Sequence, residues 1–246
     1  MNEQLLSYLF DDKPHILAAP MSRWIGLSPR FKAFATTYRD KIRKRIRVTK
    51  SGAGIKDLEA ELETAFWLLQ EQRFAVAYEP YSSEKTRGPD FAVTFKSITF
   101  NVEVTRISSR EGERPLPAPE GVTAPWLDPQ QVGGRLTDTV CGKLGQMRPG
   151  MINVLIVTTD SDFVRVLDIN RAMARLKERA ERKEVSLFGR YSFVNTADFF
   201  KYYLRLSGVL VRNVGKQDGA PDSILWANHQ AKHPIPNPIR TILQRG

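Results

Sequence analysis

The sequence predicts an α/β fold with a central mixed sheet flanked by helices. Residues 151–159, MINVLIVTT, form an almost wholly apolar run, which is typical of a central strand buried on both faces. Helical periodicity precedes and follows the strand patterns along the same chain. The chain has 246 residues, of which 41% are hydrophobic and 26% are charged. It can therefore bury a full core, and it lacks the composition of a disordered protein.

We expect residues 1–50 to form a helical basic arm packed on the core, and residues 51–246 to form an α/β domain, with one domain overall. A short helix around residues 5–10 opens the arm. Between residues 31 and 50 apolar side chains recur every four positions, which predicts a helix with a narrow apolar stripe. The stripe consists of Phe34, Tyr38, Ile42 and Ile46.

The charge balance favours a polyanionic partner. The chain carries 37 Lys and Arg against 27 Asp and Glu, a net charge of +10, so nucleic acid gains attraction and counterion release on binding. An anionic membrane surface or a protein partner remains open for a basic helix of this kind. We expect backbone phosphates to be contacted by Arg39, Lys41, Arg43, Lys44, Arg45 and Arg47.

A second helix is expected from Asp57 to about Gln72, with Glu61 on its apolar face. Three strand patterns follow, beginning at Phe74, Asp90 and Ile98. A tight turn at residues 96–97 joins the last two strands into a hairpin.

The rest of the chain alternates helices and strands. A long loop is expected over residues 107–133, which contain five prolines. Helical patterns are expected at residues 134–147, 168–184 and 198–203, with a turn or two of helix at the end of the tail. Strand patterns start at Leu206 and at Ser223, and the two strands can pair.

Two acidic residues carry the chemistry. Asp90 opens one strand and Glu103 lies midway along the next, so a hairpin can bring their carboxylates together. Alternation places Asn101, Glu103 and Thr105 on one face of the second strand. Mg²⁺ in proteins takes one or two carboxylates, together with waters and substrate phosphate oxygens. A metal held there would acidify water for in-line attack on phosphorus, which is phosphodiester hydrolysis.

This arrangement resembles the PD-(D/E)XK nuclease superfamily. Pro89 and Asp90 match the first half of its motif, and residues 103–105, Glu-Val-Thr, match the second. The resemblance covers about residues 57–158. It implies a restriction-endonuclease-like core and a nuclease that uses Mg²⁺ or Mn²⁺, with DNA as the leading substrate and RNA left open. The metal ligands that it implies are Asp90, Glu103 and Glu61.

The sequence departs from the family at Thr105, which stands where the family has a lysine. Lys143 is expected on one face of the next helix and can replace that lysine, since the family tolerates its migration. Thr105 and Gln146 would support the attacking water or the phosphate. The missing lysine also favours an alternative, a catalytically inactive nuclease-fold protein that binds nucleic acid. A basic scaffold for another partner and a homodimer are left open as well.

Each acidic residue also has a structural interpretation. Asp90 can cap a turn after Pro89, and Glu103 can pair with Arg135 or Arg106. Glu61 and Lys143 can form a salt bridge with each other, or either side chain can snorkel along apolar surface with its charged end in water.

Other features point to an ordinary interior and surface. A single cysteine, Cys141, excludes a disulfide framework and a cysteine-rich zinc site. His229 and His233 are four apart, but prolines follow at once, so we expect surface residues. Trp226, Tyr202 and Tyr203 can stack on bases, although core packing is commoner for aromatic residues near strands. No apolar run is long enough to cross a membrane, and a cytoplasmic location without a membrane partner is expected.

Overall fold

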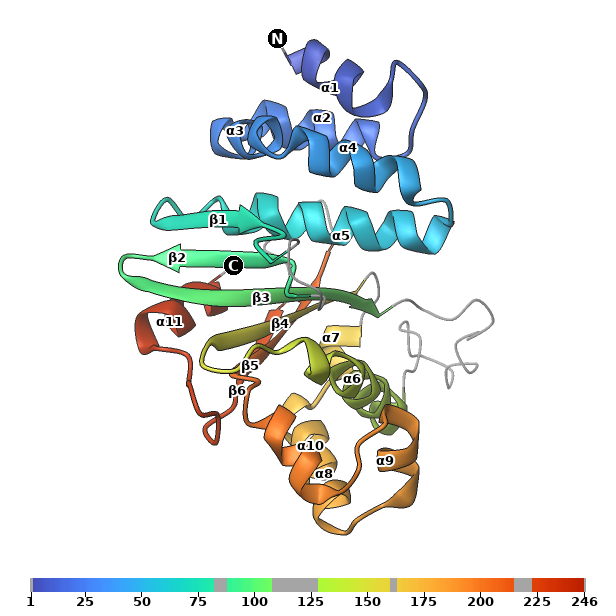
Figure 1. Ribbon diagram of the computed structural model, residues 1–246, viewed down its shortest axis with the longest axis vertical. Helices are drawn as coiled ribbons and strands as arrows, with labels where there is room; N and C mark the ends of the chain where they lie inside the picture. The colour runs from blue at the N-terminus through green and yellow to red at the C-terminus, as the bar shows by residue number, and fades with distance from the viewer. Residues whose placement is uncertain (1, 82–87, 108–127, 160–162, 215–222, 246) are drawn as a thin grey trace, which may run out of the picture. The chain divides into compact units, whose positions relative to one another are not determined.

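The structure is a computed structural model that describes residues 2–81, 88–107, 128–159, 163–214 and 223–245 (Figure 1). It has the predicted α/β class, with a six-stranded mixed open sheet in the order β1-β2-β3-β4-β5-β6. All six predicted strands are present, and they are β1 (Phe74–Tyr78), β2 (Phe91–Phe95), β3 (Ile98–Ile107), β4 (Ile152–Thr159), β5 (Gly208–Asn213) and β6 (Ser223–Ala227).

The chain divides into two compact units. The first comprises Met1–Pro80 and Asp90–Thr99, and the second comprises Tyr81–Pro89 and Phe100–Gly246. The expected domain boundary near residue 50 stays a prediction.

The first unit combines a helical layer with the antiparallel pair of β1 and β2, in which Val76 lies opposite Val93. Its helices are α1 (Asn2–Phe10), α2 (Ala18–Leu27), α3 (Pro29–Thr37), α4 (Arg39–Val48) and α5 (Gly52–Leu68). The helix α2 was not among the predicted helices, and Pro20 is accommodated in its first turn, where a missing N–H costs little.

The prediction of a single helix over residues 31–50 is wrong. The helix is interrupted at Tyr38, whose φ of −102° and ψ of 16° separate α3 from α4. Thr36 and Thr37 donate their hydroxyls to the carbonyls four residues back, at 2.8 and 2.9 Å, and such bonds bend or end helices. The apolar stripe still packs inward, since Phe34, Ile42 and Ile46 are buried.

The helix α5 begins and ends earlier than predicted. The Ser51 hydroxyl accepts a hydrogen bond from Gly54 N and caps its start at Gly52. At the other end Arg30 Nη1 donates to the carbonyls of Leu69 and Glu71, both at 2.6 Å. The guanidinium thus satisfies carbonyl groups just beyond the last turn of α5.

The second unit is built on β4, which pairs in parallel with β3 on one side and with β5 on the other. Seven of the eight β4 residues are buried, as the apolar run predicts. β6 pairs with β5 in the antiparallel sense. The helices of this unit are α6 (Pro129–Lys143), the short 3₁₀ helix η1 (Leu144–Gln146), α7 (Phe163–Val166), α8 (Ile169–Glu181), α9 (Val185–Tyr191), α10 (Thr196–Tyr203) and α11 (Asn237–Arg245).

The helix expected from residue 134 begins five residues earlier. Asp128 accepts a hydrogen bond from Gln130 N at 2.8 Å, and Pro129 occupies the first helical position. Of the loop expected over residues 107–133, residues 108–127 lie outside the described residues and residues 129–133 are helical. The helices α7 and α9 were not predicted, and α8 starts after Asp168, which caps it.

Asn153 joins β3 and β4 to the segments that precede β4 and β5. Its amide nitrogen donates to the carbonyls of Arg148, Met151 and Arg205 at 2.8 to 3.0 Å. Its amide oxygen accepts from Arg148 N at 3.2 Å and from the Asn101 amide at 3.1 Å. The side chain is 1% exposed, so water cannot replace these bonds without an opening of the fold.

We expect Asn153→Ala to lower the free energy of unfolding by about 3 kcal/mol, because several buried polar groups lose their partners together. Asn170→Ala provides a matched control, since Asn170 is exposed on α8 of the same unit. Urea denaturation of both variants measures the difference. Equal midpoints for the two variants would show that the network adds no stability.

Candidate functional site

Glu61 is the centre of a buried polar cluster in the first unit. It projects from α5 and is 5% exposed. Arg45 Nη2 donates to Glu61 Oε1 at 2.6 Å, and the Tyr78 hydroxyl donates to Oε2 at 3.2 Å. Arg45 Nη1 also donates to Glu79 Oε1 at 2.9 Å. With Asp90, these residues form what we call the Glu61 cluster.

Asp90 is 4% exposed and lies directly before β2. Its carbonyl accepts a hydrogen bond from Glu79 N at 2.7 Å, which extends the pairing of β1 and β2 by one step. Burial, and then the negative charge of Asp90, raise the pKa of Glu61 to about 7, although Arg45 and Tyr78 act in the opposite direction. The carboxylates of Glu61 and Asp90 are therefore close enough to repel each other.

Glu103 is the centre of a second cluster, in the second unit. It lies midway along β3 and is 1% exposed. Lys143 Nζ, at the end of α6, donates to Glu103 Oε1 at 2.7 Å. With its amide turned so that the nitrogen faces the carboxylate, Gln146 donates to both oxygens, at 3.0 Å to Oε2. Glu103, Lys143 and Gln146 form the Glu103 cluster.

The structure thus brings Lys143 and Gln146 to Glu103. The alternative in which Glu61 and Lys143 form a salt bridge is wrong, because Glu61 pairs with Arg45 and Lys143 pairs with Glu103. Thr105 is half-buried two residues beyond Glu103, and its carbonyl accepts a hydrogen bond from the Thr158 hydroxyl at 3.3 Å. The catalytic roles of all these residues stay predictions.

Sequence reasoning missed the position of Arg45, which was expected to face a phosphate. Arg45 directly precedes Ile46 and follows Ile42 by three positions, so it flanks the buried stripe of α4. That position was the available signal. The roles of Tyr78 and Glu79 had no comparable signal, because they depend on where the end of β1 lies beside α4.

The other basic side chains of α4 divide into two groups. Lys41 Nζ donates to the carbonyls of Tyr78 and Glu79 at 3.2 and 2.9 Å, and both Arg43 and Arg47 form ion pairs with Asp11. Lys44 is exposed, and Arg39, also exposed, lies 5.2 Å from the centre of the Tyr8 ring and 4.0 Å from Asp40 Oδ1. Five of the six side chains expected on phosphates, Arg45 included and Lys44 excepted, therefore contact groups of the described part of the protein itself.

The cysteine, the aromatic residues and the histidines that were considered as possible site residues lie in the core or on the surface, as predicted. Cys141 and Tyr203 are buried, while Tyr202 and Trp226 are half-buried against the same apolar core. His229 and His233 are exposed. Within the described part of the chain, no helix has the length and apolarity that a membrane crossing requires.

Comparison of the chain with protein-family models, with curated proteins and with solved structures gave no match.

The donor chemistry of the Glu61 cluster fits a divalent cation. The described residues contain no group of three or more His, Cys, Asp or Glu side chains arranged around a common point. A Mg²⁺ site nevertheless needs only one or two protein carboxylates, because waters and substrate oxygens complete its shell. Glu61 and Asp90 supply two buried carboxylates whose repulsion a cation would relieve.

We expect the stability of the metal-free protein to fall between about pH 4.5 and pH 7 through Glu61. Its pKa is raised to about 7 in the folded state, so the folded state holds a proton that the unfolded state has already lost. Stability therefore decreases as pH rises, by about 3 kcal/mol from this group.

Glu61→Gln should remove this component of the pH dependence, because the amide does not titrate. Urea denaturation of both proteins at pH 5 and pH 8, in the presence of a chelator, measures it. The same loss of stability in wild type and Glu61→Gln would contradict the assignment of the raised pKa to Glu61.

Proposed function

We propose that this protein is a metal-dependent nuclease that hydrolyses phosphodiester bonds, with DNA as its leading substrate. The observation that carries the proposal is the 2.7 Å contact between Lys143 Nζ and Glu103 Oε1. Thr105 occupies the motif position at which the nuclease family has its lysine. Lys143 brings an ammonium group to the motif glutamate from a helix instead of from the strand.

The proposal assigns the divalent ion, Mg²⁺ or Mn²⁺, to the Glu61 cluster, where Asp90 and Glu61 would hold it. Asp90 and Glu103 are the acids of the sequence motif, and Glu61 repels Asp90 within its own cluster. A bound ion would supply positive charge to the phosphate in the transition state and acidify the attacking water. The restriction-endonuclease-like core is part of this proposal, and the role of Glu103 as a further metal ligand, which the motif implies, stays a prediction.

The chain's own groups have separable roles in it. Lys143 holds the Glu103 carboxylate in one orientation and keeps a proton donor beside it. The Gln146 amide contacts the same carboxylate and limits its rotation. Arg45 fixes Glu61 through a 2.6 Å bond, so that one oxygen stays directed away from Arg45 toward the Tyr78 hydroxyl. Such preorganisation lowers the reorganisation cost of the reaction.

We expect Lys143→Met to reduce the rate of DNA cleavage about 100-fold or more, the range for loss of a positioned proton-transfer group. Asp90→Asn and Glu103→Gln should reduce cleavage at least as much, since these are the two acids of the motif. Plasmid and oligonucleotide cleavage with Mg²⁺ measures these rates. Lys177→Met, which changes an α8 lysine paired with Glu181, is the matched control.

The same assay separates the proposed nuclease from the inactive nucleic-acid-binding alternative, which the replacement of the motif lysine by Thr105 favours. If purified wild type cleaves no faster than Asp90→Asn and Glu103→Gln while DNA binding persists, the binding protein is the correct assignment. A circular dichroism melt of each variant distinguishes loss of chemistry from loss of fold.

We also expect Asp11→Asn to strengthen DNA binding if α4 contacts the backbone. Asp11 accepts from Arg43 and Arg47, and these two arginines hold the pKa of its carboxyl below the usual value. Removing the acid ends the ion pairs of both guanidinium groups, although Arg43 still lies over the Tyr8 ring, and asparagine tolerates the positive φ of 55° at this position. Fluorescence anisotropy should then show a steeper salt dependence than for wild type. An unchanged slope would remove Arg43 and Arg47 from the interface.

A further inference from the structure

The helices α6 and α8 of the second unit border a cavity of about 190 Å³. The two helices pack side by side, and a Cβ atom added at Gly133 would lie only 3.3 Å from the Ala172 Cβ atom. Gly134 lines the cavity one residue later, and an added Cβ there would meet nothing within 4 Å. The two helices therefore lie close together at Gly133, while the space beside Gly134 is open.

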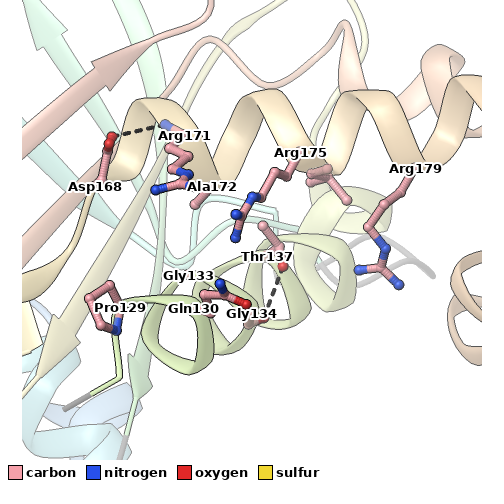
Figure 2. Close-up of a pocket in the computed structure, with 11 residues that line it drawn as sticks. Pro129, Gln130, Gly133, Gly134, Thr137, Asp168, Arg171, Ala172, Arg175 and Arg179 are labelled. Carbon is pink, nitrogen blue, oxygen red and sulfur yellow. Dashed lines mark hydrogen bonds between the residues drawn. The ribbon is translucent and has the colours of Figure 1, made fainter.

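Three arginines of α8 line this cavity at four-residue intervals. They are Arg171, Arg175 and Arg179, and Figure 2 shows their side chains extending from α8 on the side that faces α6. Residues four apart share one helix face, and eight residues of helix span about 12 Å. The row is therefore longer than a single phosphate group. We call the cavity and its three arginines the arginine groove.

Local acids neutralise only part of the arginine groove. Arg179 Nε donates to Glu184 Oε2 at 2.7 Å. Asp168 lines the opposite end, where its carboxylate accepts from the backbone N of Arg171 at 2.9 Å and caps the helix. Across the described segments, neither the Arg171 nor the Arg175 side chain forms an ion pair. Like charges four apart on a helix repel, and a bound polyanion would relieve that repulsion.

We propose that the arginine groove binds the phosphodiester backbone of one nucleic-acid strand. A row of permanently charged, planar guanidinium groups matches successive phosphates, and the open wall at Gly134 leaves room for the chain of sugars. The contact is to the backbone and is independent of base sequence. The choice of nucleic acid as the polyanion rests on the proposed function, whereas the groove rests on its own geometry.

The test uses a short fluorescent single-stranded DNA, the full chain and a chelator, so that cleavage does not contribute to the signal. We expect Arg171→Ala combined with Arg175→Ala to weaken binding about tenfold. The slope of the logarithm of affinity against the logarithm of salt concentration should fall by about 1.4 for two lost contacts. Lys177→Ala, on the same helix but outside the groove, should retain the wild-type slope.

A second variant fills the groove without removing an arginine. Gly134→Glu places a carboxylate in the open space, and glutamate favours a helix more than glycine does, so the fold should be retained. Gly189→Glu adds the same charge to α9, at a glycine that also has open space and does not line the groove. We expect Gly134→Glu to weaken binding about tenfold and Gly189→Glu to leave it unchanged.

Three results would overturn the inference. Wild-type affinity and salt slope in both groove variants would show that no strand binds there. Equal losses in Lys177→Ala or Gly189→Glu would show that only net charge matters. If the groove variants lose binding of inorganic pyrophosphate but keep that of the oligonucleotide, the groove holds a small phosphate. Because binding is measured without metal, a failure of the proposed nuclease activity is a separate result.

Discussion

The cost of burying an acid is the constraint on which the candidate site depends. Glu103 lies in the middle of β3, between Val102 and Val104, and is 1% exposed. A carboxylate in such a place destabilises the fold unless it is paired and hydrogen-bonded. Lys143 and Gln146 meet that requirement, and both come from the end of α6 and the 3₁₀ turn after it. The place where α6 ends is therefore coupled to the position of an acid on the sheet.

In the first unit a buried acid is paired with an arginine instead of a lysine. Glu61 is paired with Arg45, whose guanidinium stays charged at any physiological pH and bridges to Glu79 as well. Even so, burial and the neighbouring Asp90 raise the pKa of Glu61 to about 7. Burial is the larger cause of this shift and the charge of Asp90 is the second, so Glu61 loses its proton near neutral pH in spite of Arg45. In an ion pair with less burial, the charge of the arginine alone would hold the pKa of the acid below its usual value.

Local patterns were sufficient to predict the strands and the place of Glu103 on β3, while Asp90, expected to open β2, lies one residue before it. The wholly apolar run of β4 requires burial on both faces, and alternation in β3 placed Glu103 beside Asn101 on one face. The bounds of the helices were less accessible. The break at Tyr38 comes directly after two threonines whose hydroxyls donate to helix carbonyls, and the early start of α6 comes directly after a cap at Asp128. Side-chain bonds of this kind compete with periodicity, and a periodicity argument does not weigh them.

Positive charge was the hardest feature to place from sequence. Its density is highest in α4, but most of the side chains there bind groups of the same unit, because Asp11, Glu61 and the end of β1 lie within their reach. The density of positive charge is lower in α8 and predicted no binding surface. Arg171 and Arg175 nevertheless lie four apart on one face of α8, and no described acid pairs with their side chains. The attraction that a cation offers to a phosphate depends on how little of its charge is already neutralised. The arrangement of nearby acids, which is a property of the fold, therefore determines where a basic protein of this kind can hold a polyanion.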